Sequence, residues 1–159
     1  AGVIANNNYD ITYHGNDKVL KFVSFCDAFN IPIITFTDAA GYNEKSSQTA
    51  IIKSTAKLIA LFANATCPKI NIIVRKAFGN PYLVMNSKHI GADIVFAWPN
   101  ANVSFDESND EGLYTAAEKG YIDDIIEPAY TRKYIADVLE MLSMKREGKP
   151  SRKHSAFTI

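Results

Sequence analysis

The stretch INIIVRKAFGNPYLVM (residues 70–85) passes directly from a β-branched run into an apolar helical pattern. Residues 70–74 predict a strand that is buried on both faces, as strands of parallel sheets are. A short helix is expected from Pro81 to about residue 87. Between them, the Gly79-Asn80-Pro81 step has the layout of a turn whose backbone N–H groups bind an anion at a helix N-terminus. Such a corner suits a carboxylate or a developing oxyanion.

The same step also fits a simpler interpretation, in which no ligand binds. Asn80 is a good N-cap, and proline is favoured at the first position of a helix. Pro81 also lacks the N–H group that an anion site would use. At this turn alone, the residues therefore leave two alternatives open, an anion hole and a well-capped helix.

Outward from this turn, short strands alternate with helices along the chain. Further strands are expected at residues 3–5, 31–36, 94–97, 103–105 and 122–126, and helices at 16–30, 47–65, 114–119 and 131–146. Asn16 is the expected N-cap of the first long helix. This alternation predicts an α/β domain with parallel strands, in which ligands bind at the carboxyl ends of strands. Two such ends stand out, at residues 38–42 and 78–82.

Length and composition exclude several classes of partner. The 159 residues fit one domain, and Lys+Arg equals Asp+Glu at 17 each, so no overall field attracts nucleic acid or an anionic membrane. No apolar run approaches the roughly 20 residues that span a bilayer, and Cys26 and Cys67 have the apolar surroundings of buried thiols. A cytoplasmic protein is expected. Because the strand-like sequence begins at Ala1, the chain is expected to be part of a longer protein.

Side chains with catalytic spacing are absent from the sequence. It contains no G-x-S-x-G, Walker A, G-x-G-x-x-G or H-E-x-x-H motif. His14, His89 and His154 lie far apart and without the spacing of metal ligands, so no metal site is expected. The acidic residues between Asp106 and Glu111 are interpreted as a solvated loop. Backbone N–H groups at the two strand ends therefore remain as the candidate functional groups.

Three long segments, residues 16–38, 67–101 and 116–154, resemble the C-terminal half of the biotin-dependent carboxyltransferase family. Their most specific blocks are FCDAFNIPIITFTD, the 70–85 stretch and AAEKGYIDDIIEPAY. This family includes the β subunits of propionyl-CoA and other acyl-CoA carboxylases, and related decarboxylase subunits. The resemblance covers nearly the whole chain, with its segments in order. It implies a crotonase-like fold of repeated ββα units over residues 1–148, followed by a basic extension at 149–159.

The resemblance also implies the chemistry and the partners. In this family an N-terminal half binds acyl-CoA, and the C-terminal half receives carboxybiotin from a biotin carrier domain. The active site lies between domains of two subunits, so a homo-oligomer is implied. Carboxybiotin releases CO2, the biotin enolate takes the α-proton of the thioester, and the carbanion captures CO2. Backbone N–H groups hold both oxyanions, and neither a metal nor nucleic acid takes part.

Carried over position by position, the family's Y-G-G-A-Y-D stretch falls on residues 78–83. The two N–H groups implied to hold the biotin oxygen fall on Asn80, beside Gly79, and on Pro81, where no N–H exists. Losing one such donor costs roughly 3 to 4 kcal/mol, a factor of about a hundred to a thousand in rate. Leu83 stands at the position where the family has an acidic residue. Gly41 and Tyr42 keep part of a second loop, and the resemblance implies that Gly41, Tyr42, Pro81 and Leu83 line the biotin pocket.

Departures from the family pattern leave alternatives open. The loop after Asp38 is short and lacks the family's prolines, and DESNDEGL stands where the family has a long helical insertion. A carboxyltransferase-type domain of an acyl-CoA carboxylase is the first hypothesis. A biotin-dependent decarboxylase subunit, a non-catalytic module of the same fold, and an independent crotonase-type hydratase or isomerase are the others.

Overall fold

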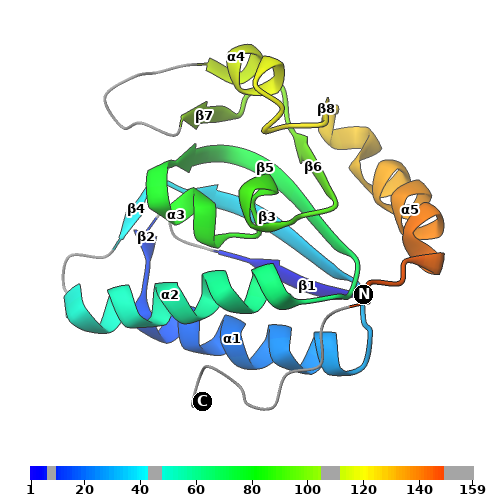
Figure 1. The fold of residues 1–159 in the computed structure, drawn as a ribbon. Coiled ribbons are helices and arrows are strands. Elements are labelled where there is room, and N and C mark those ends of the chain that lie inside the picture. Colours follow the sequence, from blue (N-terminus) through cyan, green and yellow to red (C-terminus); the bar gives the residue numbers. More distant parts are fainter. Residues whose placement is uncertain (7–9, 43–47, 105–111, 149–159) are drawn as a thin grey trace.

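The computed structural model describes residues 1–6, 10–42, 48–104 and 112–148, which form one α/β unit (Figure 1). The strands are β1 (Gly2–Ala5), β2 (Asp10–Ile11), β3 (Ile33–Ala39), β4 (Gly41–Tyr42), β5 (Lys69–Phe78), β6 (Ile94–Ala97), β7 (Asn102–Ser104) and β8 (Asp124–Ile125). The main sheet has the order β1-β3-β5-β6-β8, with β7 also paired to β5. All of these pairs are parallel, as predicted from the alternation of strands and helices.

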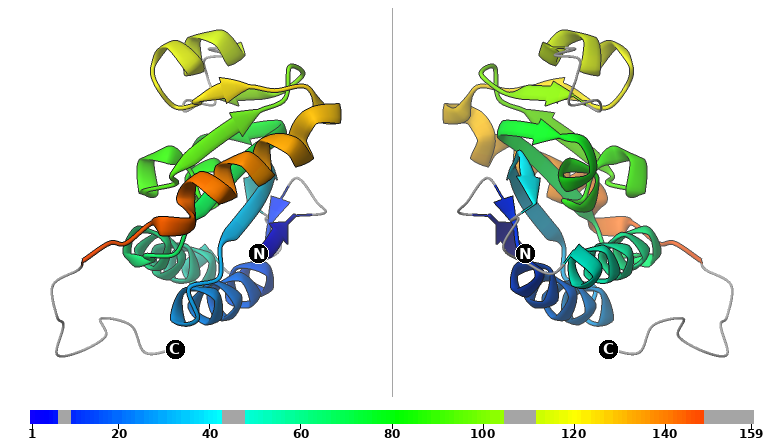
Figure 2. Two further views of the ribbon diagram at one scale, coloured as in Figure 1. Left: turned by 90° about the vertical axis from the view of Figure 1, so that its right-hand side faces the viewer. Right: turned by 90° about the vertical axis from the view of Figure 1, so that its left-hand side faces the viewer.

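Helices cover both faces of this sheet. They are α1 (Tyr13–Ala28), α2 (Gln48–Asn64), α3 (Gly79–Val84), α4 (Gly112–Glu118) and α5 (Thr131–Met141). Neighbouring residues of a strand point to opposite faces, and Ile33 packs with α1 and α2 whereas Ile34 packs with α5. Figure 2 shows α5 crossing the sheet on the side away from the α1–α2 pair.

Two successive ββα units open the chain. β1, β2 and α1 form the first, and β3, β4 and α2 form the second. The second strands of the two units, β2 and β4, pair with each other in a small parallel sheet apart from the main one. This repeat confirms the crotonase-like α/β fold that the resemblance implies. It also places Gly41 and Tyr42 in a strand, where the sequence had predicted a loop.

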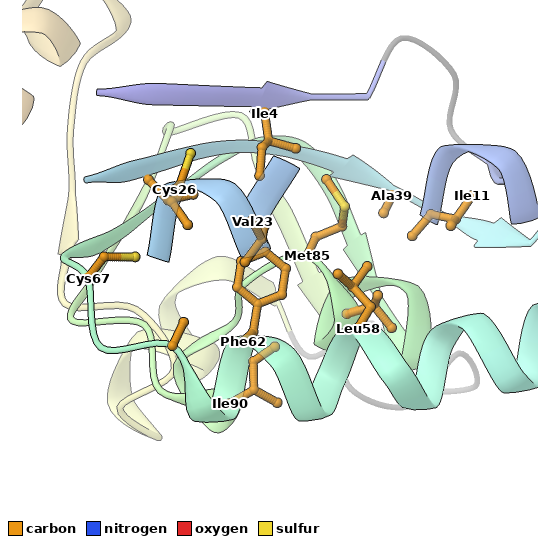
Figure 3. Packing of buried hydrophobic residues seen from close by; sticks show 13 residues of the cluster. Ile4, Ile11, Val23, Cys26, Ala39, Leu58, Phe62, Cys67, Met85 and Ile90 are labelled. Atoms are coloured by element: carbon orange, nitrogen blue, oxygen red, sulfur yellow. The ribbon is translucent and has the colours of Figure 1, made fainter. Parts of the chain in front are cut away.

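The largest buried cluster lies between the first strands and the two long helices. Ile4, Val23, Leu58 and Phe62 point into it from β1, α1 and α2, as Figure 3 shows. Cys26 and Cys67 belong to the same cluster as free, buried thiols, which confirms the interpretation made from their apolar surroundings. Because this cluster joins both ββα units, it fixes the end of β3 relative to the helices.

The structure corrects the predicted end of one strand and the predicted cap of one helix. The strand predicted at residues 70–74 continues to Phe78, because its second half pairs with β7. Asn16 is not an N-cap: α1 starts at Tyr13, and Thr12 Oγ1 accepts the capping bond from the Gly15 N–H at 3.0 Å. Asn16 is instead buried, and its Nδ2 donates to Ser54 Oγ at 3.1 Å, which links α1 to α2.

Some predictions fall on residues that the structure does not describe. These are the basic extension at 149–159 with His154, the acidic residues 106–111, and most of the loop at 43–47 that follows Tyr42. The division of the chain at residue 148 stays a prediction. In the described ranges, no helix combines the length and the apolar character that crossing a membrane requires.

The position of the α1 cap can be tested by substitution. We expect Thr12→Ala to lower the free energy of unfolding by about 1 kcal/mol, because the Gly15 N–H loses its acceptor. Thr12→Ser keeps the hydroxyl and is the matched control, with a much smaller loss. Urea denaturation measures both variants. Equal stability of Thr12→Ala and the parent protein would contradict this cap.

Candidate functional site

The two strand ends that the sequence singled out lie side by side. Ala39, near the end of β3, pairs with Ala77, near the end of β5. Tyr42 and Leu83 then pack against the same buried cluster, so β4 and α3 meet above the ends of the two strands. The predicted residues Gly41, Tyr42, Gly79, Asn80, Pro81 and Leu83 therefore belong to one corner of the molecule. Whether biotin binds at this corner stays a prediction.

The turn between β5 and α3 is tighter than the sequence suggested. α3 begins at Gly79 and its N-cap is Phe78, so Asn80 is not the N-cap and Pro81 is not the first helical residue. Gly79 has a φ of +50°, in the left-handed region that residues with a Cβ rarely adopt. The chain can therefore turn directly from strand to helix because residue 79 is glycine.

The amide of Asn80 has the properties of a free donor. It is the second residue of α3, and the first four N–H groups of a helix have no intrahelical acceptor. Among the described residues, no backbone or side-chain acceptor outside α3 is hydrogen-bonded to this N–H. Asn80 is exposed, whereas Gly79 and Pro81 on either side are buried. The corner thus contains one backbone donor without an acceptor among the described residues outside α3, on an exposed residue.

Pro81 occupies a position where the helix does not need an N–H. As the third residue of α3, it belongs to the turn whose amides find no partner within the helix. Its presence therefore costs α3 no hydrogen bond, but it removes the donor next to Asn80. The short helix is compatible with proline, and the predicted anion site would have a single amide here.

Tyr42 and Leu83 are packing residues as well as candidate pocket residues. Both are half-buried and contact the cluster formed by β1, β3, α1 and α2. Burial raises the pKa of the Tyr42 phenol, and the Thr55 hydroxyl opposes part of that shift. Tyr42 is therefore neutral at physiological pH. Leu83 supplies no charge at the position where the family carries an acid.

A set of buried polar side chains under α3 was missed by the sequence analysis. Thr37 Oγ1 donates to Asn71 Oδ1 at 2.7 Å and also lies 3.3 Å from the carbonyl oxygen of Met85. Asn86 Nδ2 contacts Thr35 Oγ1 at 3.4 Å and the Ile70 carbonyl oxygen at 3.3 Å. These bonds fasten the residues after α3 to β3 and β5. Single polar residues within the apolar runs IITFTD and INIIV were the available signal.

Asp38 makes the strongest polar contacts near the corner. Its Oδ2 accepts from Arg75 Nε at 2.9 Å and is paired with Arg75 Nη2 at 2.7 Å, while Oδ1 accepts from the Lys76 N–H at 3.2 Å. The Asp38 side chain is only 12% exposed, whereas that of Arg75 is 60% exposed. The aspartate therefore binds two consecutive residues of β5 from a largely buried position.

The described ranges contain neither a metal-binding group of ionisable side chains nor a reactive thiolate at Cys67. No group of three or more His, Cys, Asp or Glu residues there could hold a metal ion. Burial, with the nearby Asp27 carboxylate, raises the pKa of the Cys67 thiol to about 12, so Cys67 is not a thiolate nucleophile at neutral pH. The main chain at the corner is the chemistry that this part of the protein offers.

Comparison with known proteins agrees with this architecture. The model of the carboxyl transferase domain matches residues 1–105. The chain belongs to the carboxyl transferase family. The propionyl-CoA carboxylase beta chain of Saccharopolyspora erythraea is 36% identical, covering 99% of this chain and 36% of that protein. Methylmalonyl-CoA decarboxylase subunit alpha of Veillonella parvula is 37% identical, covering 99% of this chain and 37% of its own.

Solved structures show the same fold for this carboxyl transferase chain. Transcarboxylase 12S, described as a hexamer and solved with hydrolysed methylmalonyl-coenzyme A, matches with a TM-score of 0.89 and 34% identity. The match covers 99% of this chain and 36% of the 12S chain. The chain thus spans little more than a third of the length of these relatives.

The backbone geometry of the corner gives a direct test. We expect Gly79→Ala to lower the free energy of unfolding by about 1 to 2 kcal/mol, because its φ of +50° is unfavourable for a residue with a Cβ. Gly41→Ala is the matched control: a Cβ there would meet Asp10 Oδ1 at 3.4 Å, an ordinary contact. Thermal unfolding of both variants distinguishes strain from simple loss of glycine. Equal losses in the two variants would contradict the left-handed corner.

Proposed function

We propose that this chain is the biotin-facing half of the carboxyltransferase of a biotin-dependent acyl-CoA carboxylase of the propionyl-CoA carboxylase type. The observation that carries the proposal is the Asn80 amide, which has no acceptor outside α3 among the described residues and belongs to a helix that contacts β4 (Gly41–Tyr42). Membership of the carboxyl transferase family and the close agreement with transcarboxylase 12S support it. The partners are an acyl-CoA-binding half and a biotin carrier domain.

The residues at the corner provide some of the contacts that bound carboxybiotin would need. The Asn80 N–H, which has no acceptor among the described residues outside α3, would be the donor to the ureido oxygen of biotin, and two half-buried side chains, Tyr42 and Leu83, would offer an apolar wall. Carboxybiotin, when bound, supplies CO2 to the acyl-CoA and leaves negative charge on its ureido oxygen. Asn80 N–H stabilises that charge, and the positive end of the α3 dipole adds to it. Pro81 shapes the wall without donating.

The relatives include a carboxylase chain and a decarboxylase subunit at nearly equal identity. Both reactions develop charge on the same biotin oxygen, so the corner serves either. We place carboxylation first, with decarboxylation as the alternative. A homo-oligomer is proposed because the solved 12S relative is a hexamer, and the cytoplasmic location expected from the sequence stays a prediction.

Restoring the second donor tests the role of the corner. In the complete enzyme, assembled with its acyl-CoA-binding half and biotinylated carrier, we expect Pro81→Ala to increase the rate of carboxyl transfer, by up to about a hundredfold. The physical reason is the added N–H beside Asn80, at a position that α3 leaves without an internal partner. The measurement is transfer of labelled carboxyl from carboxybiotin to propionyl-CoA.

The control and the contradicting result use the same assay. Pro81→Gly also restores an N–H, but without the helix preference of alanine, so it is expected to gain less. A rate that falls in Pro81→Ala, with the fold intact, would show that the ring of Pro81 is needed at the site. Absence of carboxyl transfer in both the parent enzyme and Pro81→Ala would favour the alternative of a non-catalytic module.

A further inference from the structure

The pairing of β3 with β5 changes register at Asp38. From Ile33 to Thr37 the two strands pair residue for residue, with Thr37 opposite Ile73. The next pair joins Ala39 to Ala77, so Asp38 alone faces the three residues 74–76 and β5 contains two extra residues at this point. A register change of this kind removes regular ladder bonds and bends the strand. Contacts outside the ladder must therefore hold residues 74–76 of β5 in place.

Hydrogen bonds of Asp38 hold β3 to the segments on both of its sides. Toward β5, the carboxylate accepts from the Lys76 N–H and from Arg75, using one oxygen for each residue. Toward β1, the Asp38 N–H donates to Asn6 Oδ1 at 3.1 Å, and the Asn6 side-chain amide donates to the Asp38 carbonyl oxygen. Asp38 thus bonds to the residue that follows β1 and to β5, at the point where the pairing of β3 with β5 is interrupted.

The register change decides where the corner lies. β4 begins at Gly41, two residues after Ala39, and α3 begins at Gly79, two residues after its partner Ala77. The earlier register would have put Ala77 and the start of α3 two positions further along β3, about 6.6 Å at roughly 3.3 Å per residue. The observed register therefore starts β4 and α3, which contact each other, from paired residues. The candidate site therefore depends on the extra residues that Asp38 secures.

We propose that Asp38 is a positioning residue for carboxyl transfer, and that its bonds to Arg75 and Lys76 hold the Asn80 amide level with the Gly41–Tyr42 wall. The expected loss of rate rests on the proposed function, whereas the expected shift of residues 78–80 rests on the register alone. Asp38 does not itself line the candidate site, and it acts on the site through its bonds to β5. Its loss is expected to displace the donor without removing it.

The variants Asp38→Asn and Arg75→Gln test the proposal in the complete enzyme. Asparagine has one acceptor oxygen where the carboxylate uses two, so its NH2 group must face either the Lys76 N–H or the Arg75 guanidinium. We expect kcat for carboxyl transfer to fall about tenfold or more, since misplacement of a catalytic group by about 1 Å can cost a hundredfold. KM for acyl-CoA is expected to change less than about twofold, because that substrate is bound by the other half.

Asp93→Asn is the matched control at the opposite end of β5. Asp93 Oδ2 accepts from the Lys69 N–H at 2.7 Å, and its carboxylate pairs with Lys145 Nζ at 2.8 Å, so it too joins a β5 amide to a basic side chain. Asp93→Asn is expected to lower stability while leaving kcat per folded enzyme within about twofold of the parent value. Arg75→Gln, at an exposed position, should act like Asp38→Asn, and the double variant should be no worse than Asp38→Asn alone.

Crystal structures of the parent enzyme and of Asp38→Asn or Arg75→Gln give the second measurement. The expected result is a shift of residues 78–80 relative to Gly41 and Tyr42. An unshifted corner would overturn the proposal, as would an equal loss of kcat in Asp93→Asn. If the parent enzyme transfers no carboxyl group, the proposed function fails, and the structures still decide whether Asp38 sets the register. If Asp38→Asn does not fold, Arg75→Gln decides both points.

Discussion

The interruption of pairing between β3 and β5 is the constraint on which the candidate site depends. A parallel sheet with one continuous register would carry β5 two residues further past β3 and move the start of α3 away from the start of β4. The Asp38 carboxylate replaces the missing ladder bonds with bonds to Arg75 and Lys76. A single largely buried charge, neutralised by a partly exposed arginine, therefore links sheet topology to local geometry at the corner.

The parts of the fold that follow from hydrophobic patterning were predictable. The strand expected at residues 94–97 coincides with β6, and the alternation of elements gave the parallel α/β class correctly. The candidate positions at both strand ends were named from the sequence, and the structure brings them together. Their assignment to a biotin pocket came from the resemblance, since glycine, asparagine and proline in a turn fit a capped helix equally well.

The remaining features could not be predicted because they depend on contacts between distant residues. Asn16 resembles a cap in sequence, yet it is buried because Ser54, in the next helix, offers an acceptor. The sequence predicted a strand over residues 70–74 only, yet residues 75–78 continue β5 because β7 and Asp38 provide partners. Local propensity is a weak guide wherever tertiary bonds of this kind override it.

Tyr42 and Leu83 have a consequence for how this protein can diverge. The same two side chains form the outer surface of the main buried cluster and the wall of the candidate pocket. A substitution that enlarges this wall or adds a charge to it also changes the packing of α1 and α2 beneath it, because protein interiors are close-packed and transmit such changes. Altered binding at the candidate pocket and lowered thermal tolerance are therefore expected to arise together, and compensating changes to appear in the two long helices rather than at the pocket itself.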